Sequence, residues 1–141
     1  MSEPRVIPML AYADAGAAAD WICRAFGFRE TGRFADRSGT VTDVVLERPD
    51  GAKVMVGHPT DAYEGSRAHA AHCAAAARWL DHPYIVDGVV VLVDDVDAHY
   101  TAAVGAGALI LSGLETNPLQ RQYRVEDLEG HRWMFATPIQ R

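Results

Sequence analysis

The chain has 141 residues, of which 49% are hydrophobic and 23% charged, a balance that is typical of a globular domain and argues against disorder. The formal net charge of -6 disfavours a nucleic-acid-binding surface, because no stripe of Lys and Arg could offset it. The longest apolar runs, such as residues 88–93, are far too short to cross a bilayer, so we expect a cytoplasmic protein with no membrane partner. The two cysteines, Cys23 and Cys73, lie in segments with helical character, so no disulfide framework is expected.

The first half of the chain predicts a strand, a helix and a pair of strands. The expected elements are a strand over 6–12, a helix over 17–26, and strands over 40–47 and 52–57 that flank a tight turn at 49–51. Asp14 is placed to cap the helix by accepting backbone N–H bonds, and Gly27 is placed to end it in a left-handed conformation.

The segment over 60–83 is rich in alanine, the strongest helix former, and predicts one connecting helix. Ser66 is its expected cap, and the helix is expected to stop near His82 and Pro83. This length suggests that the helix packs across the opening of the domain or against a partner subunit.

The second half repeats the order of elements seen in the first. We expect a strand over 88–93, a cap at Asp94 or Asp95, a helix over 98–104 that stops at Gly105 and Gly107, and strands over 123–126 and 132–136 around a turn at 128–130.

Identical residues recur between the two halves at a fixed spacing. The pairs Gly51 and Gly130, Met55 and Met134, and Pro59 and Pro138 are each 79 positions apart. The sequence therefore predicts an α+β fold with two tandem modules of the same element order. The expected single domain, 1–141, comprises module one (4–59), the connecting helix (60–83) and module two (84–138).

Several segments carry a family resemblance. They are Ile-Pro-Met-Leu over 7–10, Ala-Asp-Trp over 19–21, Ala-Phe-Gly-Phe over 25–28, and the closing stretch over 123–135. With them the chain resembles the glyoxalase/bleomycin-resistance/extradiol-dioxygenase group, also called the vicinal-oxygen-chelate superfamily. That resemblance implies the fold strongly, as two tandem βαβββ modules that form a curved mixed sheet around a central cup. It implies the function weakly, since the group includes lyases, isomerases, dioxygenases, thiol transferases and non-catalytic drug-binding proteins.

The resemblance also implies where a metal would bind. Each module of the family's metalloenzymes supplies a His or Gln from its first strand and a Glu from its last strand. The last-strand positions fall on Met55 and Met134. The first-strand positions fall on Ile7 and Gly88, or, one residue later, on Pro8 and Val89. Thioether, aliphatic and glycine positions bind hard or borderline divalent cations poorly, so we expect no metal and no cofactor.

An apolar, polarisable cup is expected instead. Alternate strand residues share a face, so the expected ligand-binding residues are Met9, Lys53, Met55, Leu92, Tyr123, Arg132 and Met134. Lys53 and Arg132 could hold a carboxylate or phenolate, and Tyr123 could stack on a planar ligand. Trp133 and Phe135 are expected to point the other way, into the core.

His69 and His72 share a helical face, which could bind a metal with His58 or His82 or could be an ordinary solvated face.

The leading hypothesis is a metal-independent protein, similar to the drug-sequestering, antibiotic-resistance members of the family, that binds a hydrophobic or aromatic small molecule and pairs as a homodimer. The alternative is a lyase, isomerase or dioxygenase-like enzyme that uses Arg132, His131 or Tyr123, or a displaced metal. A third hypothesis is a subunit with a vestigial cup.

Overall fold

The computed structural model describes residues 4–82 and 87–139, and the chain divides into two compact units between Gly65 and Ser66. The expected helix stop at Pro83 and the expected start of module two at residue 84 lie outside the described residues. No helix among the described residues is long and apolar enough to span a membrane.

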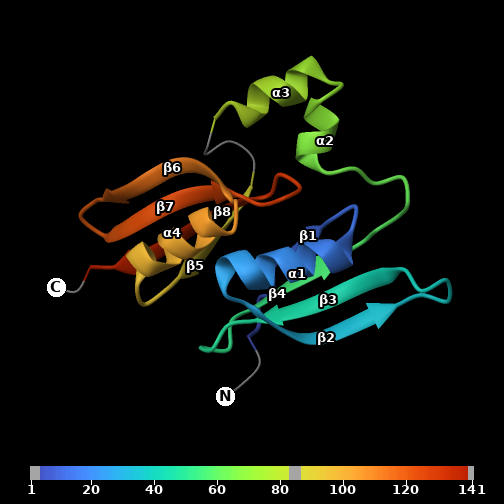
Figure 1. The fold of residues 1–141 in the computed structure, drawn as a ribbon, viewed down its shortest axis with the longest axis horizontal. Coiled ribbons are helices and arrows are strands. Elements are labelled where there is room, and N and C mark those ends of the chain that lie inside the picture. Colours follow the sequence, from blue (N-terminus) through green and yellow to red (C-terminus); the bar gives the residue numbers. More distant parts are fainter. Residues whose placement is uncertain (1–3, 83–86, 140–141) are drawn as a thin grey trace. The chain divides into compact units, whose positions relative to one another are not determined.

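The first unit is a βαβββ module (Figure 1). Its elements are β1 (Met9–Ala11), α1 (Ala15–Phe26), β2 (Arg29–Ala35), β3 (Val41–Glu47) and β4 (Lys53–Gly57). The strands form a mixed sheet in the order β1-β4-β3-β2, in which β1 and β4 are parallel. The helix α1 covers one face of this sheet.

Capping fixes the position of α1 as the sequence predicts. The Ala17 backbone N–H donates to Asp14 Oδ1 at 3.0 Å. Gly27 has a φ of 76°, which a residue with a Cβ adopts only with strain, and its N–H donates to the Cys23 carbonyl. The buried face of α1 packs on β3 and β4, so the core of this unit lies between the helix and one face of the sheet.

The second unit repeats this module and adds two short helices before it. Its elements are α2 (Ser66–Ala70), α3 (Ala74–Leu80), β5 (Gly88–Leu92), α4 (Val96–Gly105), β6 (Leu109–Thr116), β7 (Gln120–Glu126) and β8 (Arg132–Pro138). The strand order β5-β8-β7-β6 matches that of the first sheet, again with a parallel first pair. The α+β fold with two tandem βαβββ modules is thus confirmed, with β2 and β6 as strands whose bounds the sequence did not indicate.

The cap of α4 is Asp95 rather than Asp94, because the Ala98 N–H donates to Asp95 Oδ1 at 3.0 Å. The helix packs on the face of the sheet that carries Tyr123, Trp133 and Phe135, all of which are fully or almost fully buried. The expectation that Trp133 and Phe135 face the core is confirmed.

The connecting segment is two helices, not the single helix that the sequence predicts. After α2 the Ala71 and His72 N–H groups donate three residues back, to Ala68 and His69, and Cys73 then adopts an extended conformation with a φ of -137°. Ser66, the expected cap, is the first residue of α2, and its hydroxyl donates to the Gly130 carbonyl at 3.0 Å.

Three charged side chains tie this segment to the sheet of the second unit. Arg67 donates to both oxygens of Glu126, at 2.6 Å for Nη2 and 3.1 Å for Nε. Arg132 Nε donates to Glu126 at 3.2 Å. The remaining Arg132 nitrogens donate to the carbonyls of Leu80 and His82, at 2.8 and 2.6 Å. The segment is thus anchored near both of its ends.

Candidate functional site

Each sheet has one face that no helix of its own module covers, and we call it the open face. In β4, Val54 and Val56 are buried against α1, whereas Lys53, Met55 and Gly57 alternate with them and are half-buried. The last-strand position of module one therefore lies on the open face of the first sheet, as the period of two residues requires.

A row of apolar side chains crosses the open face of the first sheet. Met9 is paired with Met55, and Met55 with Val45, so the three side chains stand side by side across β1, β4 and β3. We call these three residues the methionine row. Met9 is 69% exposed. Two thioethers and a β-branched side chain provide a polarisable, adaptable floor for an aromatic ring.

On β2, Gly32 and Phe34 extend the apolar surface of the methionine row. Gly32 is paired with Val45, and a Cβ at Gly32 would lie 3.6 Å from the Phe34 ring and 3.9 Å from a Val45 methyl group. Phe34 itself is 59% exposed. The absence of a side chain at Gly32 therefore leaves the Phe34 ring beside the methionine row without a group standing between them.

An open pocket of about 170 Å³ begins at the end of this row. Its lining residues come from the ends of β1, β3 and β4 and from the loop after β4, and they are Met9, Leu10, Ala11, Thr42, Asp43, Gly57, His58 and Pro59. His58 Nε2 lies 3.0 Å from Asp61 Oδ1, and this hydrogen bond raises the pKa of His58 above its usual value. The pocket thus combines an apolar floor with a carboxylate and an imidazole at its rim.

The second sheet carries a comparable open face with more polar surroundings. Met134 is paired with Val90 on one side and Arg124 on the other. Val90 and Leu92 on the same face are 60% and 52% exposed. The two last-strand methionines therefore occupy equivalent places in the two sheets.

Beside Met134 lies a network of polar side chains that the sequence analysis missed. Gln122 Nε2 and Arg124 Nη1 both donate to Glu115 Oε1, at 3.0 and 3.3 Å. Gln120 Nε2 donates to Gln122 Oε1 at 2.7 Å and lies 3.6 Å from the Met134 sulfur. The signal in the sequence is the polar residue at every second position from 120 to 126, which marks the open face of β7.

Arg132 lies on the open face, but it is not available to an anionic ligand. This corrects the prediction that it binds one. Its side chain is 5% exposed and is fully engaged by Glu126 and by the carbonyls of Leu80 and His82. The structure therefore assigns Arg132 to anchoring the connecting segment.

Tyr123 does not lie on the open face, which corrects its expected place in the cup. It is paired with Phe135 and so shares the face of that core residue. It is fully buried, its ring stacks on Phe135, and its hydroxyl lies 2.6 Å from His99 Nδ1. Burial raises the pKa of Tyr123, which keeps the phenol neutral at all physiological pH values.

The residues at the metal-ligand positions of the family do not fit a divalent cation. Met55 and Met134 offer thioether sulfur, which suits soft ions only, and Ile7 and Gly88 offer no side-chain donor. Within the described part of each unit, no three His, Cys, Asp or Glu side chains gather on an open face. The Glu115 carboxylate, which belongs to the polar network beside Met134, already accepts hydrogen bonds from Gln122 and Arg124.

Comparison with known proteins gives the same family as the sequence resemblance. Residues 7–135 match the model of the Glyoxalase/Bleomycin resistance protein/Dioxygenase superfamily. The chain is 34% identical to TioX from Micromonospora sp. ML1. The match covers 98% of this chain and 98% of TioX, with a TM-score of 0.69. It is 28% identical to an uncharacterized protein of Mycobacterium tuberculosis over 97% of this chain and 76% of that protein.

The fold also matches that of TnmS3, an antibiotic binding protein from Streptomyces sp. CB03234. The identity is 17%, the match covers 99% of this chain and 100% of TnmS3, and the TM-score is 0.61.

Proposed function

Because the chain belongs to the glyoxalase/bleomycin resistance/dioxygenase superfamily, we propose that it is a metal-independent binding protein for a planar, hydrophobic small molecule. The observation that carries the proposal is the methionine row, since a thioether stands where the family's metalloenzymes place a carboxylate. The antibiotic binding protein TnmS3 shares this fold, so the fold is compatible with such a role.

On the first sheet, ligand contacts are assigned to the open-face residues Met9, Lys53 and Met55. On the second sheet, considered by itself, the corresponding open-face residues are Leu92 and Met134. An aromatic ring laid on the methionine row would remove apolar surface from water at about 25 cal/mol per Å². On the open face of the second sheet, Gln120 and Gln122 provide amide donors and acceptors beside Met134 that could orient a polar substituent of a ligand bound to that sheet.

Two of the three residues first considered for the alternative enzymatic role, Arg132 and Tyr123, do not favour it. Arg132 is committed to Glu126, and the Tyr123 hydroxyl is buried against His99. We also propose that the protein is a cytoplasmic homodimer. Light scattering of the purified protein tests the homodimer.

The test is a binding titration with N-phenyl-1-naphthylamine, an uncharged planar dye that becomes fluorescent in apolar surroundings. We expect saturable binding to the wild-type protein and a loss of affinity of about tenfold or more, roughly 1.4 kcal/mol, in Met55→Glu, because the dye would desolvate the new carboxylate. The matched control is Val104→Glu, an exposed apolar residue on α4. Equal affinity in the two variants would overturn the assignment of the methionine row.

A further inference from the structure

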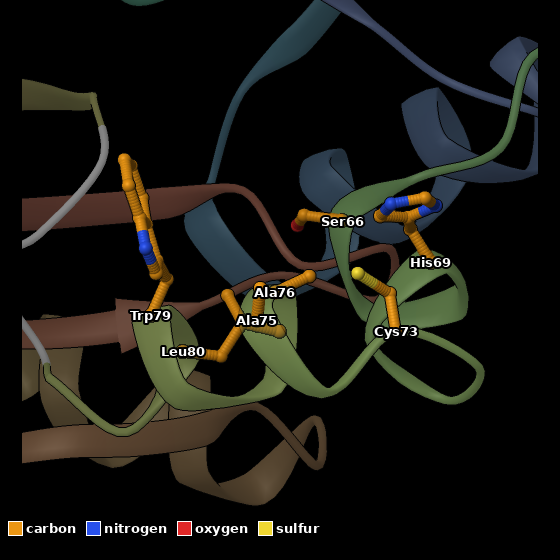
Figure 2. Close-up of a pocket in the computed structure, with 7 residues that line it drawn as sticks. All are labelled: Ser66, His69, Cys73, Ala75, Ala76, Trp79 and Leu80. Carbon is orange, nitrogen blue, oxygen red and sulfur yellow. The ribbon is translucent and has the colours of Figure 1, made fainter.

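A second, larger pocket lies along the connecting helices α2 and α3 (Figure 2). Its volume is about 350 Å³, and its lining residues are Ser66, His69, Cys73, Ala75, Ala76, Trp79 and Leu80. Small-molecule sites in proteins begin at about 300 Å³, so this space is large enough for one aromatic ring system. None of its lining residues belongs to an open face of either sheet.

The two ends of this pocket differ in chemistry. Figure 2 shows the Trp79 indole at one end and the Cys73 sulfur beside the His69 ring at the other. The indole is 60% exposed, and Ala75, Ala76 and Leu80 continue its apolar surface. An exposed indole at the wall of a cavity offers a flat stacking surface to a planar molecule.

The thiol at the other end is activated. Hydrogen bonding to the backbone of Ala76, and also to that of Ala75, lowers the pKa of Cys73, and the hydrogen-bonded His69 side chain lowers it further. A larger thiolate fraction at neutral pH means faster attack on soft electrophiles. The side chain is half-buried, so it remains accessible from the pocket.

The other cysteine provides an internal contrast. Burial raises the pKa of the Cys23 thiol, and the neighbouring carboxylates of Glu30 and Asp20 raise it further. Cys23 is equally half-buried, yet it lines neither this pocket nor the one beside the methionine row. The chain therefore carries one activated thiol in a cavity and one deactivated thiol outside it.

We propose that the pocket between Trp79 and Cys73 binds planar, apolar α,β-unsaturated carbonyl compounds and that Cys73 captures them covalently. The site combines three independent features, namely a cavity of suitable size, an exposed indole for stacking, and a thiol hydrogen-bonded to His69. This site shares no residue with the methionine row and does not depend on the function proposed above.

The capture step is a conjugate addition. His69 accepts the proton of the Cys73 thiol, and the sulfur forms a bond to the β-carbon of the electrophile. The π electrons of the carbon–carbon double bond move toward the carbonyl group to give an enolate, which takes the proton back at the α-carbon. The product is a thioether, and the addition consumes no oxidant or reductant.

The experiment compares N-phenylmaleimide with N-methylmaleimide, which carry the same reactive group with and without a planar apolar ring. Rates at each cysteine are followed by peptide mass mapping and are divided by the rates on N-acetylcysteine, to remove intrinsic reactivity. We expect Cys73 to react with N-phenylmaleimide with saturable kinetics. The phenyl-to-methyl rate ratio at Cys73 should exceed the ratio on N-acetylcysteine about tenfold. An equal ratio, or faster reaction at Cys23, would overturn the proposal.

Two variants separate stacking from activation. Trp79→Ala should reduce the phenyl-to-methyl ratio to that of N-acetylcysteine while leaving the N-methylmaleimide rate unchanged, and that unchanged rate also shows that the site has folded. His69→Asn should slow both reagents several-fold at neutral pH and move the pH–rate profile of Cys73 upward, with the ratio preserved. Val104→Ala on α4 is the control. A Trp79→Ala protein that keeps the wild-type ratio would contradict the proposed stacking.

Because Cys73 lies outside both open faces, Cys73→Ser should bind N-phenyl-1-naphthylamine as the wild type does. Failure of covalent capture and failure of dye binding to the methionine row are therefore distinguishable.

Discussion

The cluster of Arg67, Glu126 and Arg132 allows a quantitative test of how the connecting segment is held. Glu126 has a side-chain exposure of 3% and accepts hydrogen bonds from both arginines. Its replacement by Gln would remove the one negative charge between two positive ones and leave Arg132, 5% exposed, without an ionic partner. Breaking a buried ion pair by removing one partner costs about 3–5 kcal/mol.

We therefore expect Glu126→Gln to lower the free energy of unfolding by about 3–5 kcal/mol, and the melting temperature by roughly 10 °C for a chain of this size. Arg67→Ala should cost only about 1 kcal/mol, because 47% of the Arg67 side chain is exposed and water screens its charge.

Urea denaturation followed by circular dichroism measures both values. The matched control is Glu115→Gln, which removes a carboxylate that is 50% exposed and lies 3.3 Å from Arg124, and which should cost about 1 kcal/mol or less. A loss below about 1 kcal/mol for Glu126→Gln, equal to that of Glu115→Gln, would refute the idea that this cluster anchors the segment.

Three further outcomes follow from individual contacts. Asp14→Ala and Asp95→Ala should each lower the free energy of unfolding by about 1 kcal/mol through loss of a helix cap, whereas Asp94→Ala should change it by less than about 0.5 kcal/mol. Tyr123→Phe should cost about 1–3 kcal/mol by removing the buried hydrogen bond between the Tyr123 hydroxyl and His99 Nδ1. Dye binding should be unchanged, and a loss of binding would return Tyr123 to the site. By NMR titration the pKa of His58 should lie above its usual value of 6.5, and it should fall in Asp61→Asn. Because the pKa is raised in the folded protein, the stabilisation from this pair is fully present below about pH 6.5 and is lost as the pH rises through the raised pKa.

Local patterns predicted the elements that local forces control. The caps at Asp14 and Asp95 and the end of α1 at Gly27 depend on neighbouring residues only, and they lie where the sequence indicates. The period of two residues also placed Met55 and Met134 on the open faces. These features follow from backbone geometry and require no knowledge of distant contacts.

Features that depend on distant residues were not predictable. The partners of Arg132 lie on β7 and at the end of α3, and the latter are 50 or more residues away. The bond from the Ser66 hydroxyl to the Gly130 carbonyl likewise joins residues that are 64 positions apart. Tyr123 is a different case: it was assigned to the wrong face, although the polar residues at every second position from 120 to 126 already place it on the opposite, buried face of β7.

The most direct test of metal-independent binding is a calorimetric titration with N-phenyl-1-naphthylamine in the presence and absence of EDTA, together with elemental analysis of protein purified without a chelator. We expect the same affinity in both titrations and no stoichiometric zinc, nickel or iron. Loss of binding in EDTA, or one equivalent of a divalent metal per chain, would contradict the proposal.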